Sequence, residues 1–270
     1  MKATISNILR PDGRALVVAM DHARDWGGLP GLERPGETIA RVVSGGADAI
    51  MTTYGVAKQF GHLTADRVAM IVRLDGWASH YRESWLQYSG WQSLYTVEDA
   101  LRVGADAVIV NYFMGGPAEH DSLRGLARAA AEADQLGVPL VAECLPCPGP
   151  NIAEPNDPEV IAVSARIASE HGADMIKCYY SGSEKGFRQV TETNPAPVLI
   201  AGGAVMNTSL DVLTVVSDAL RAGARGVFFG KNIWQAADPE AMTAAMRRVI
   251  HEGMPPDEAV TALTPLAAVH

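Results

Sequence analysis

The sequence predicts an α/β fold, a (β/α)₈ TIM barrel that spans residues 1–270 as a single domain. The first observation behind this prediction is a series of short apolar runs, each followed by a stretch of helical character. Strands that are apolar throughout, without polar alternation, are typical of parallel strands buried on both faces. The eight runs are Ala15–Met20, Ala47–Thr53, Val68–Leu74, Ala107–Tyr112, Val138–Leu145, Met175–Tyr179, Pro197–Ala201 and Gly226–Phe229.

The second observation is a loop that recurs before four of these runs, at Gly45–Ala49, Gly104–Ala107, Gly172–Met175 and Gly223–Gly226. Each copy has Gly, then Ala and a polar residue, then a strand, which is the chemistry of an αβ loop. The spacing of roughly 50–70 residues is that of a quarter of a barrel. Gly-Ala-Asp is also a common loop by itself, so the combination with eight apolar runs carries the prediction.

The helices between the runs are predicted from apolar residues at helical spacing. The clearest stretches are Asp121–Gln135, Asp157–Glu170 and Ser209–Ala222.

Composition and charge exclude several classes of protein. The 270 residues suit one barrel of about 250 residues. A formal charge of −9 argues against nucleic acid or an anionic membrane as a partner. No window approaches the 18 or so apolar residues of a membrane span, and the polar N-terminus predicts no signal peptide. Three cysteines are too few for a disulfide framework, so we expect a cytoplasmic protein.

The active site of such a barrel lies at the carboxyl ends of its strands. These positions hold Asp21, His22, Tyr54, Arg73, Asp75, Asn111, Tyr112, Glu143, Cys144, Lys177, Tyr179, Gly202, Gly203, Gly230 and Lys231. They are the candidates for chemistry.

Lys177 is the clearest of these candidates, because it interrupts the apolar run Met175–Tyr179 and would point into the barrel. A buried ammonium group is costly unless it is paired or loses its proton. A neutral buried amine is a competent nucleophile toward a carbonyl carbon. The alternative is a structural lysine in a salt bridge.

A phosphate site is predicted after the seventh and eighth runs, where Gly202 and Gly203, and then Gly230 and Lys231, follow the strands. Barrels often bind phosphate with these two loops. Glycine lets backbone N–H groups approach phosphate oxygens closely, and Lys231 adds positive charge. Glycines that only permit tight turns are the alternative.

Two carboxylates complete the predicted site. Asp21 would orient the lysine, hold a substrate hydroxyl or relay a proton, or else cap the following turn. Glu143 ends the strand beside that of Lys177 and is the best general acid and base, although a structural salt bridge to Arg73 or Lys177 is also open. Arg73, His22 and Tyr54 are further candidates for binding substrate.

Three other features have less specific meaning. The aromatic segment Trp77–Tyr95 would shape the pocket or pack an interface, and the apolar tail after Pro256 would dock on a neighbouring subunit. Cys144 and Cys147 match a C-x-x-C pattern, but no second pair or histidine cluster completes a metal site. We therefore expect no metal.

Three segments, Ile176–Gly182, Pro197–Gly203 and Gly223–Gln235, resemble the archaeal-type (DhnA-like) class I fructose-bisphosphate aldolases. The wider DeoC/LacD aldolase group is similar too, including the thiolase of autoinducer-2 breakdown and the synthase of early archaeal aromatic biosynthesis. The segments Ala19–His22 and Gly45–Ile50 also fit, so the resemblance covers nearly the whole chain.

The resemblance implies a Schiff-base aldolase that acts on a phosphorylated sugar-like substrate, needs no metal or organic cofactor, and forms homo-oligomers. It implies that Lys177 is the Schiff-base lysine and that Asp21 contacts substrate. Gly202, Gly203, Gly230 and Lys231 match the phosphate-binding turns, although the family usually has Arg where Lys231 stands.

One departure concerns the proton shuttle. The archaeal bisphosphate aldolases have Trp-Ser-Tyr-Pro where this chain has Glu143-Cys144-Leu145-Pro146, so Leu145 replaces the shuttle tyrosine. Leucine cannot move a proton. Glu143, Tyr179 or Tyr54 would have to do so, and cleavage of fructose 1,6-bisphosphate itself is in doubt.

We therefore predict a class I aldolase acting on a phosphorylated ketose or ketone, with a dihydroxyacetone-phosphate-type donor. A related Schiff-base thiolase or biosynthetic synthase is the first alternative. A phosphosugar isomerase with a structural Lys177, and a barrel that binds ligand without turnover, are the other two.

Overall fold

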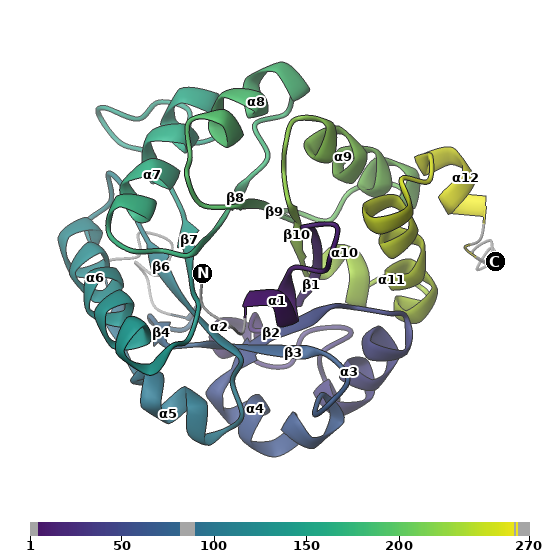
Figure 1. Cartoon of the computed structure of the whole chain (residues 1–270), viewed down its shortest axis with the longest axis horizontal. Coiled ribbons are helices and arrows are strands. Elements are labelled where there is room, and N and C mark those ends of the chain that lie inside the picture. The colour runs from purple at the N-terminus through teal and green to yellow at the C-terminus, as the bar shows by residue number, and fades with distance from the viewer. Residues whose placement is uncertain (1–4, 82–89, 262, 264–270) are drawn as a thin grey trace.

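Eight parallel strands close into a barrel in the computed structural model, in the order β1-β10-β9-β8-β7-β6-β3-β2. The structure describes residues 5–81, 90–261 and 263. Figure 1 looks along the barrel, with the strands around the centre and the helices in an outer ring. The predicted (β/α)₈ barrel is confirmed, whereas a single domain over residues 1–270 stays a prediction.

All eight apolar runs form the strands of this barrel. Their bounds are β1 Ala15–Ala19, β2 Ala49–Thr53, β3 Ala69–Arg73, β6 Ala107–Tyr112, β7 Leu140–Cys144, β8 Met175–Tyr179, β9 Val198–Ala201 and β10 Gly226–Phe229. A separate antiparallel pair, β4 Asp75–Gly76 and β5 Gln92–Ser93, lies outside the barrel sheet.

The three helices singled out from the sequence form α6, α7 and α9. The helices are α1 Ile5–Ile8, α2 Ala23–Trp26, α3 Pro35–Ser44, α4 Tyr54–Phe60, η1 Gly61–Leu63, α5 Val97–Arg102, α6 Glu119–Leu136, α7 Pro158–Glu170, α8 Glu184–Glu192, α9 Ser209–Arg221, α10 Lys231–Trp234, α11 Pro239–Arg247, η3 Arg248–Glu252 and α12 Pro256–Thr261. Capping boxes, in which the cap threonine and an aspartate bond each other's backbone N–H, fix the starts of α5 and α9.

Successive side chains of each strand alternate between the barrel interior and the helices. Val17, Met51, Ile71 and Val141 belong to the inner cluster, and α1 adds Ile5 and Ile8 at the amino-terminal end of the barrel. Their sequence neighbours pack outward against the helices in a larger cluster. This alternation decides which residues near the strand ends can reach the barrel axis.

The repeated Gly-Ala-polar loops hold neighbouring strands together. In three copies the aspartate, Asp48, Asp106 or Asp174, accepts a hydrogen bond from the backbone N–H at or near the start of the preceding barrel strand, at 2.6–2.8 Å. In the fourth copy Arg225 replaces the aspartate, and its backbone N–H donates to Val198 O at 2.8 Å. The repeated loop therefore helps to fix the register of neighbouring strands.

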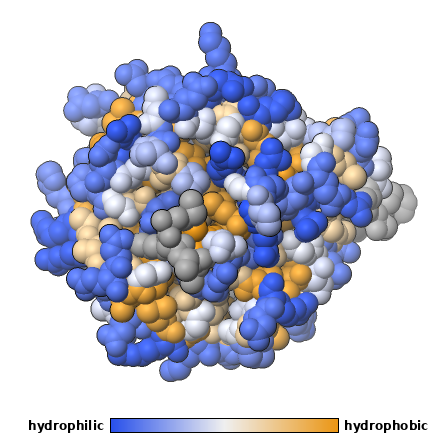
Figure 2. Space-filling model, viewed as in Figure 1, coloured by the Kyte–Doolittle hydropathy of each residue, from blue (hydrophilic) through white to orange (hydrophobic). Residues whose placement is uncertain are grey.

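The surface in Figure 2 is largely hydrophilic over the helices, and hydrophobic residues show mainly between them and toward the centre. Among the described residues, no helix has the length and apolar composition needed to cross a membrane. Trp85 and Tyr88 of the predicted aromatic segment lie outside the described residues, as do residues 262 and 264–270 of the C-terminal tail.

His251 joins two carboxylates beneath the barrel. Its Nδ1 lies 2.8 Å from Asp12 Oδ2 and its Nε2 lies 2.8 Å from Asp48 Oδ2. Burial lowers the pKa of His251, but the two carboxylates outweigh burial and hold the pKa above its ordinary value. The charged form is therefore favoured in the folded protein.

We expect His251→Gln to lower the free energy of unfolding by about 1–3 kcal/mol at about pH 5.5, and by less at about pH 9. A raised folded pKa gives stability that is complete below the unfolded pKa and is lost as pH rises through the folded pKa. Urea unfolding at both pH values measures this, with the exposed His62→Gln as control. An equal loss at both pH values would contradict it.

Candidate active site

A pocket of about 520 Å³ opens at the carboxyl ends of the barrel strands. A larger hollow, lined by Arg10, Lys58 and Arg67, lies at the amino-terminal ends and contains none of the predicted site residues. The pocket is lined by Ala19, Asp21, His22, Arg24, Asp25, Trp26, Trp77, Asn111, Glu143, Leu145, Asn156, Lys177, Tyr179, Ala201, Gly202, Gly203, Ala204, Phe228, Gly230 and Lys231.

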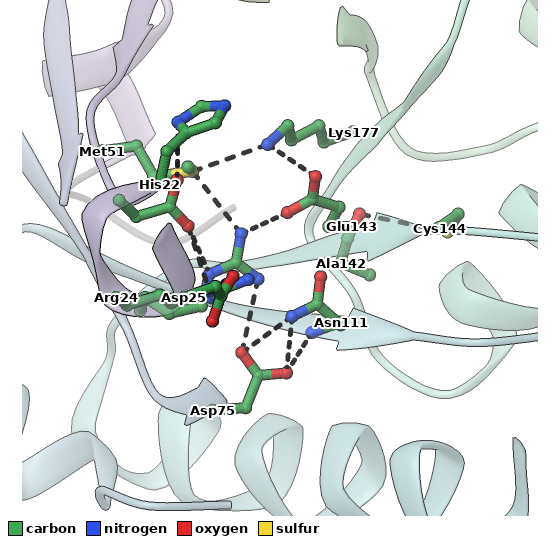
Figure 3. A network of polar contacts seen from close by, with 12 residues as sticks. His22, Arg24, Asp25, Met51, Asp75, Asn111, Ala142, Glu143, Cys144 and Lys177 are labelled. Atoms are coloured by element: carbon green, nitrogen blue, oxygen red, sulfur yellow. Dashed lines mark hydrogen bonds and ion pairs between the residues drawn. The ribbon is translucent and has the colours of Figure 1, made fainter. Parts of the chain in front are cut away.

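Lys177 and Glu143 meet at the floor of this pocket. They are register partners on β8 and β7, and both point inward. Lys177 Nζ lies 2.7 Å from Glu143 Oε1, and both side chains are almost completely buried. Figure 3 shows the two side chains directed toward each other. Met51 Sδ lies 3.9 Å from Lys177 Nζ, and the centroid of the Phe228 ring lies 5.7 Å from it.

Arg73, on β3, connects the carboxylates of the site. Its Nε donates to Asp21 Oδ2 at 3.0 Å, one terminal nitrogen lies 3.3 Å from Asp75 Oδ1, and the other bonds Glu143 Oε2. With its side chain 2% exposed, Arg73 lies under the pocket rather than in its lining. Its guanidinium is occupied by protein carboxylates, so we assign it a positioning role instead of the expected contact with substrate.

A second layer of hydrogen bonds holds Asp75 in place. Asp75 Oδ2 accepts from Trp91 Nε1 and from the Asn111 backbone N–H, both at 2.6 Å, and Asn111 Nδ2 donates to both carboxylate oxygens at 3.0 Å. Asp75 and Asn111 were visible as polar residues at strand ends. Trp91 gave no such signal, because its bond depends on the β4–β5 excursion.

The charges fix the protonation of the carboxylates. Burial raises the pKa of Asp21, but Arg73 and Arg24 outweigh burial and hold it well below its usual range. Burial likewise raises the pKa of Glu143, and Lys177 and Arg73 together bring it below its ordinary value. Both groups are therefore anionic near neutral pH. The pKa of His22 is lowered by burial and by Lys177, so this imidazole is neutral.

The glycine turns after β9 and β10 lie at one wall of the pocket. Gly203 has φ +62°, a left-handed conformation. A Cβ at Gly230 would come within 2.7 Å of Ala19 O and of the His22 ring. Asn232, which the sequence analysis missed, links the turns by donating to Gly202 O and Ala204 O at 3.1 and 3.0 Å. The pocket wall is thus bare backbone beside Lys231.

The remaining predicted residues lie in different places. Tyr179 stands at the rim, 36% exposed, and His22 lines the pocket. Leu145 lines it too and packs with Trp77. Tyr54 is not part of the lining: it begins α4 and stacks on Tyr95, with ring centroids 4.4 Å apart. Tyr54 was expected to bind substrate, but the structure places it outside the pocket lining.

The two cysteines of the C-x-x-C pattern, Cys144 and Cys147, are buried free thiols. Cys144 packs in the cluster beneath the helices, and Cys147 packs near Trp77. Burial raises the pKa of Cys144 to about 12 and that of Cys147 to about 11, so both are neutral thiols. Within the described part of the chain, no group of His, Cys, Asp and Glu is arranged to hold a metal ion.

Comparisons with known proteins agree with this architecture. The model of the DeoC/LacD family of aldolases matches residues 15–236. An uncharacterized aldolase of Saccharolobus solfataricus is 36% identical over 258 residues, covering 93% of this chain and 94% of the relative. A 2-amino-3,7-dideoxy-D-threo-hept-6-ulosonate synthase of Halobacterium salinarum is 37% identical over 254 residues, covering 94% and 93%.

Two further matches concern chemistry. A 2-amino-4,5-dihydroxy-6-oxo-7-(phosphonooxy)heptanoate synthase of Streptomyces griseus is 33% identical over 241 residues, covering 89% of this chain and 86% of the relative. The structure of a Schiff-base-forming fructose-1,6-bisphosphate aldolase superposes with a TM-score of 0.83 at 28% identity, covering 93% of this chain and 99% of that one.

The site is thus a buried lysine with carboxylates at the carboxyl ends of the strands of a parallel barrel. This chain belongs to the DeoC/LacD family of aldolases, a family of the class I, Schiff-base type.

We expect Arg73→Met to lower the free energy of unfolding by about 3–5 kcal/mol, because buried carboxylates would lose their shared cation. Urea denaturation measures the loss. The matched control is Arg102→Met, which removes a guanidinium that is 62% exposed and should cost about 0–1 kcal/mol. A similar small change for both variants would contradict the structural role of Arg73.

Proposed function

We propose that this protein is a class I aldolase in which Lys177 forms a Schiff base with a phosphorylated ketone. The observation that carries the proposal is the contact of 2.7 Å between Lys177 Nζ and Glu143 Oε1 inside the pocket. An amine must lose a proton before it attacks a carbonyl carbon, and a carboxylate at hydrogen-bond distance can accept that proton.

In the proposed reaction, the iminium formed by Lys177 acts as the electron sink. The Lys177 amine adds to the ketone, and loss of water gives an iminium. In the cleavage direction a base takes the proton of the β-hydroxyl, the C–C bond breaks, its electron pair enters the iminium to give an enamine, and an aldehyde leaves. Protonation of the enamine and addition of water release the ketone and restore the amine. This chemistry requires no metal or organic cofactor.

Glu143 is the proposed acid and base, since Leu145 stands where the archaeal bisphosphate aldolases carry their shuttle tyrosine. Both oxygens of Glu143 are within reach of cations, so its anionic form persists near neutral pH. Tyr179 at the rim is the second candidate for moving protons. Asp21 holds a substrate hydroxyl or keeps Lys177 oriented.

The phosphate is proposed to bind at Gly202, Gly203, Gly230 and Lys231. The turns offer bare backbone, and Lys231 offers a point charge without the two-pronged geometry of Arg. Anchoring the phosphate there would fix the distance from the ketone carbon to Lys177.

A biosynthetic synthase that uses the same lysine is the second candidate. It is favoured by the two relatives named as synthases, whose products are a 2-amino ulosonate and a 2-amino phosphonooxyheptanoate. The thiolase named in the resemblance remains a further alternative. A homo-oligomer also stays a prediction.

We expect incubation with dihydroxyacetone phosphate and borohydride to give one adduct per chain, located on Lys177 by peptide sequencing. Lys177→Ala should give no adduct and lose turnover, because Lys231, the other lysine among the described lining residues, stands at the glycine turn proposed to bind phosphate. Lys185→Ala, an exposed lysine, is the control. Turnover that survives in Lys177→Ala would refute the mechanism and favour an isomerase, and binding without any turnover would favour a non-catalytic barrel.

We expect Lys231→Met to raise KM for the phosphorylated ketone by about 10- to 100-fold, the loss of about 1.5–3 kcal/mol expected for a charge-assisted bond. The effect on the corresponding unphosphorylated ketone should be much smaller. Steady-state kinetics on the pair of ketones measures the difference, and an equal rise for both would show that Lys231 does not bind phosphate.

A further inference from the structure

A hollow of about 780 Å³ opens at the amino-terminal ends of the strands, at the other end of the barrel from the proposed active site. Its lining comes from α1, from the loop before β1, from α4 and η1, from the start of β3 and from the end of α5. Figure 1 shows α4 and α5 as neighbours in the outer ring, with α1 over the centre of the barrel. The volume lies in the range of small-molecule pockets. We call this feature the amino-terminal hollow.

The lining of the amino-terminal hollow is cationic, although the protein is acidic. Among the described lining residues four are arginine or lysine and two are aspartate. The whole chain has 22 lysines and arginines against 31 aspartates and glutamates. The four cations are Arg10, Lys58, Arg67 and Arg102. A concave surface concentrates the field of such charges, so this hollow favours an anion.

Most of the N–H donors of these cations are free. The exposed side chains of Lys58 and Arg67 form no ion pair or hydrogen bond with any described residue. Arg10 donates from Nε to Asp48 Oδ1 at 2.7 Å, and its terminal nitrogens have no hydrogen bond within the described part of the chain. Arg102 pairs within its own helix α5. The donors that a ligand can use therefore belong to Lys58, Arg67 and the end of Arg10.

The backbone that carries Arg67 is fixed before any ligand binds. The Arg67 N–H donates to Thr64 O at 3.0 Å, and the Thr64 N–H donates to Gly61 O at 3.1 Å. The Thr64 hydroxyl also donates to Gly61 O, at 2.8 Å. Asp66, just before Arg67, has φ +61°, a left-handed conformation that non-glycine residues seldom adopt. A segment ordered in this way loses little entropy when a ligand binds.

Gly61 leaves space in the amino-terminal hollow. Its φ of −56° suits any residue, so the backbone does not require glycine at this position. A Cβ on Gly61 would lie 3.4 Å from Met70 Cε and 3.5 Å from Val103 O, and both of these residues line the hollow. A larger side chain at position 61 would therefore occupy part of the space that a ligand needs.

We propose that the amino-terminal hollow is a second anion site of this protein, and that it binds a phosphorylated molecule without an aromatic ring. The phosphate oxygens accept hydrogen bonds from Lys58, from Arg67 and from the terminal nitrogens of Arg10. The site is independent of the lysine chemistry proposed for the other end of the barrel.

Geometry favours a phosphate over a carboxylate in this hollow. The three cations come from separate segments, because Lys58 lies on α4, Arg67 lies before β3 and Arg10 lies before β1. The oxygens of a phosphate point in several directions and can meet all three, whereas a planar carboxylate suits a single guanidinium. The described lining contains no Phe, Tyr or Trp on which a nucleobase could stack. A sugar phosphate or inorganic pyrophosphate therefore fits better than a nucleotide.

An occupant of the hollow would contact a strand that also serves the active site. Met70 lines the hollow and lies on β3, three residues before Arg73. Arg73 binds the carboxylates at the carboxyl end of the same strand. A ligand that binds only the folded barrel stabilises it by mass action, so binding can be measured from stability as well as from heat.

The test is titration calorimetry of the full chain with inorganic pyrophosphate. We expect a Kd below about 1 mM, and binding of citrate about 10-fold weaker or more. An increase in NaCl from about 50 to about 500 mM should weaken the binding of pyrophosphate about 10-fold or more, because the cations are exposed to screening. Absence of binding would overturn the proposal, and equal affinity for citrate would contradict the assignment to phosphate.

Two variants locate the ligand. Lys58→Met combined with Arg67→Met should raise the Kd for pyrophosphate by about 10- to 100-fold, through the loss of charge-assisted hydrogen bonds. Gly61→Leu should raise it as much by filling the hollow, while every charge stays in place. The control is Arg128→Met combined with Lys185→Met, which removes the same charges from exposed positions on α6 and α8. An unchanged Kd in either test variant would overturn the proposal. If Gly61→Leu does not fold, the double variant decides.

A Lys231→Met background separates this site from the phosphate site proposed at the glycine turns. Pyrophosphate should still bind in this background with a Kd within about 2-fold of that in the unaltered protein. At about 100 times the Kd it should also raise the Tm, and the added Lys58→Met and Arg67→Met changes should abolish this rise. Loss of binding in Lys231→Met alone would assign pyrophosphate to the active site and overturn the proposal.

Discussion

The site depends on one cation, Arg73, that is shared by three carboxylates. Its guanidinium holds Asp21, Asp75 and Glu143 from strands or strand ends on different sides of the barrel. Four or more charges would be prohibitively expensive to bury separately, but each here has an opposite charge at contact distance. The ion pair with Arg73 therefore keeps Glu143 ionised beside Lys177 inside the barrel.

The register of the strands then places the polar side chains of the site next to one another. Glu143 pairs with Lys177 in register, and Asn111 pairs with Glu143 on the other side. A shift of one residue on any of these strands would send the side chain outward, where Cys144 and Cys178 now pack against helices. The aspartates of the repeated loops accept hydrogen bonds from the starts of neighbouring strands. The register that they fix at the amino-terminal end of the barrel also sets which side chains face each other at the carboxyl end.

The lining of the pocket carries charges of both signs. Lys231 stands beside the glycine turns, and Arg24 and Asp25 of α2 form an ion pair at 3.1 Å. Lys177 and Glu143 lie in the same pocket, 2.7 Å apart.

Much of this protein was determined by its sequence alone. Eight apolar runs and a repeated loop predicted the barrel, because burial on both faces leaves a local signature in each strand. The same reasoning placed Lys177, Glu143, Asp21 and the glycine turns at one end of it.

Only the tertiary structure decided how these residues act on each other. The ion pairs of Arg73 with Asp21 and Glu143 and the bond from Trp91 to Asp75 depend on contacts between segments far apart in the chain. So does the stacking of Tyr54 on Tyr95 outside the pocket. Local sequence carries no record of such contacts, because they depend on barrel closure and on the path of the loops.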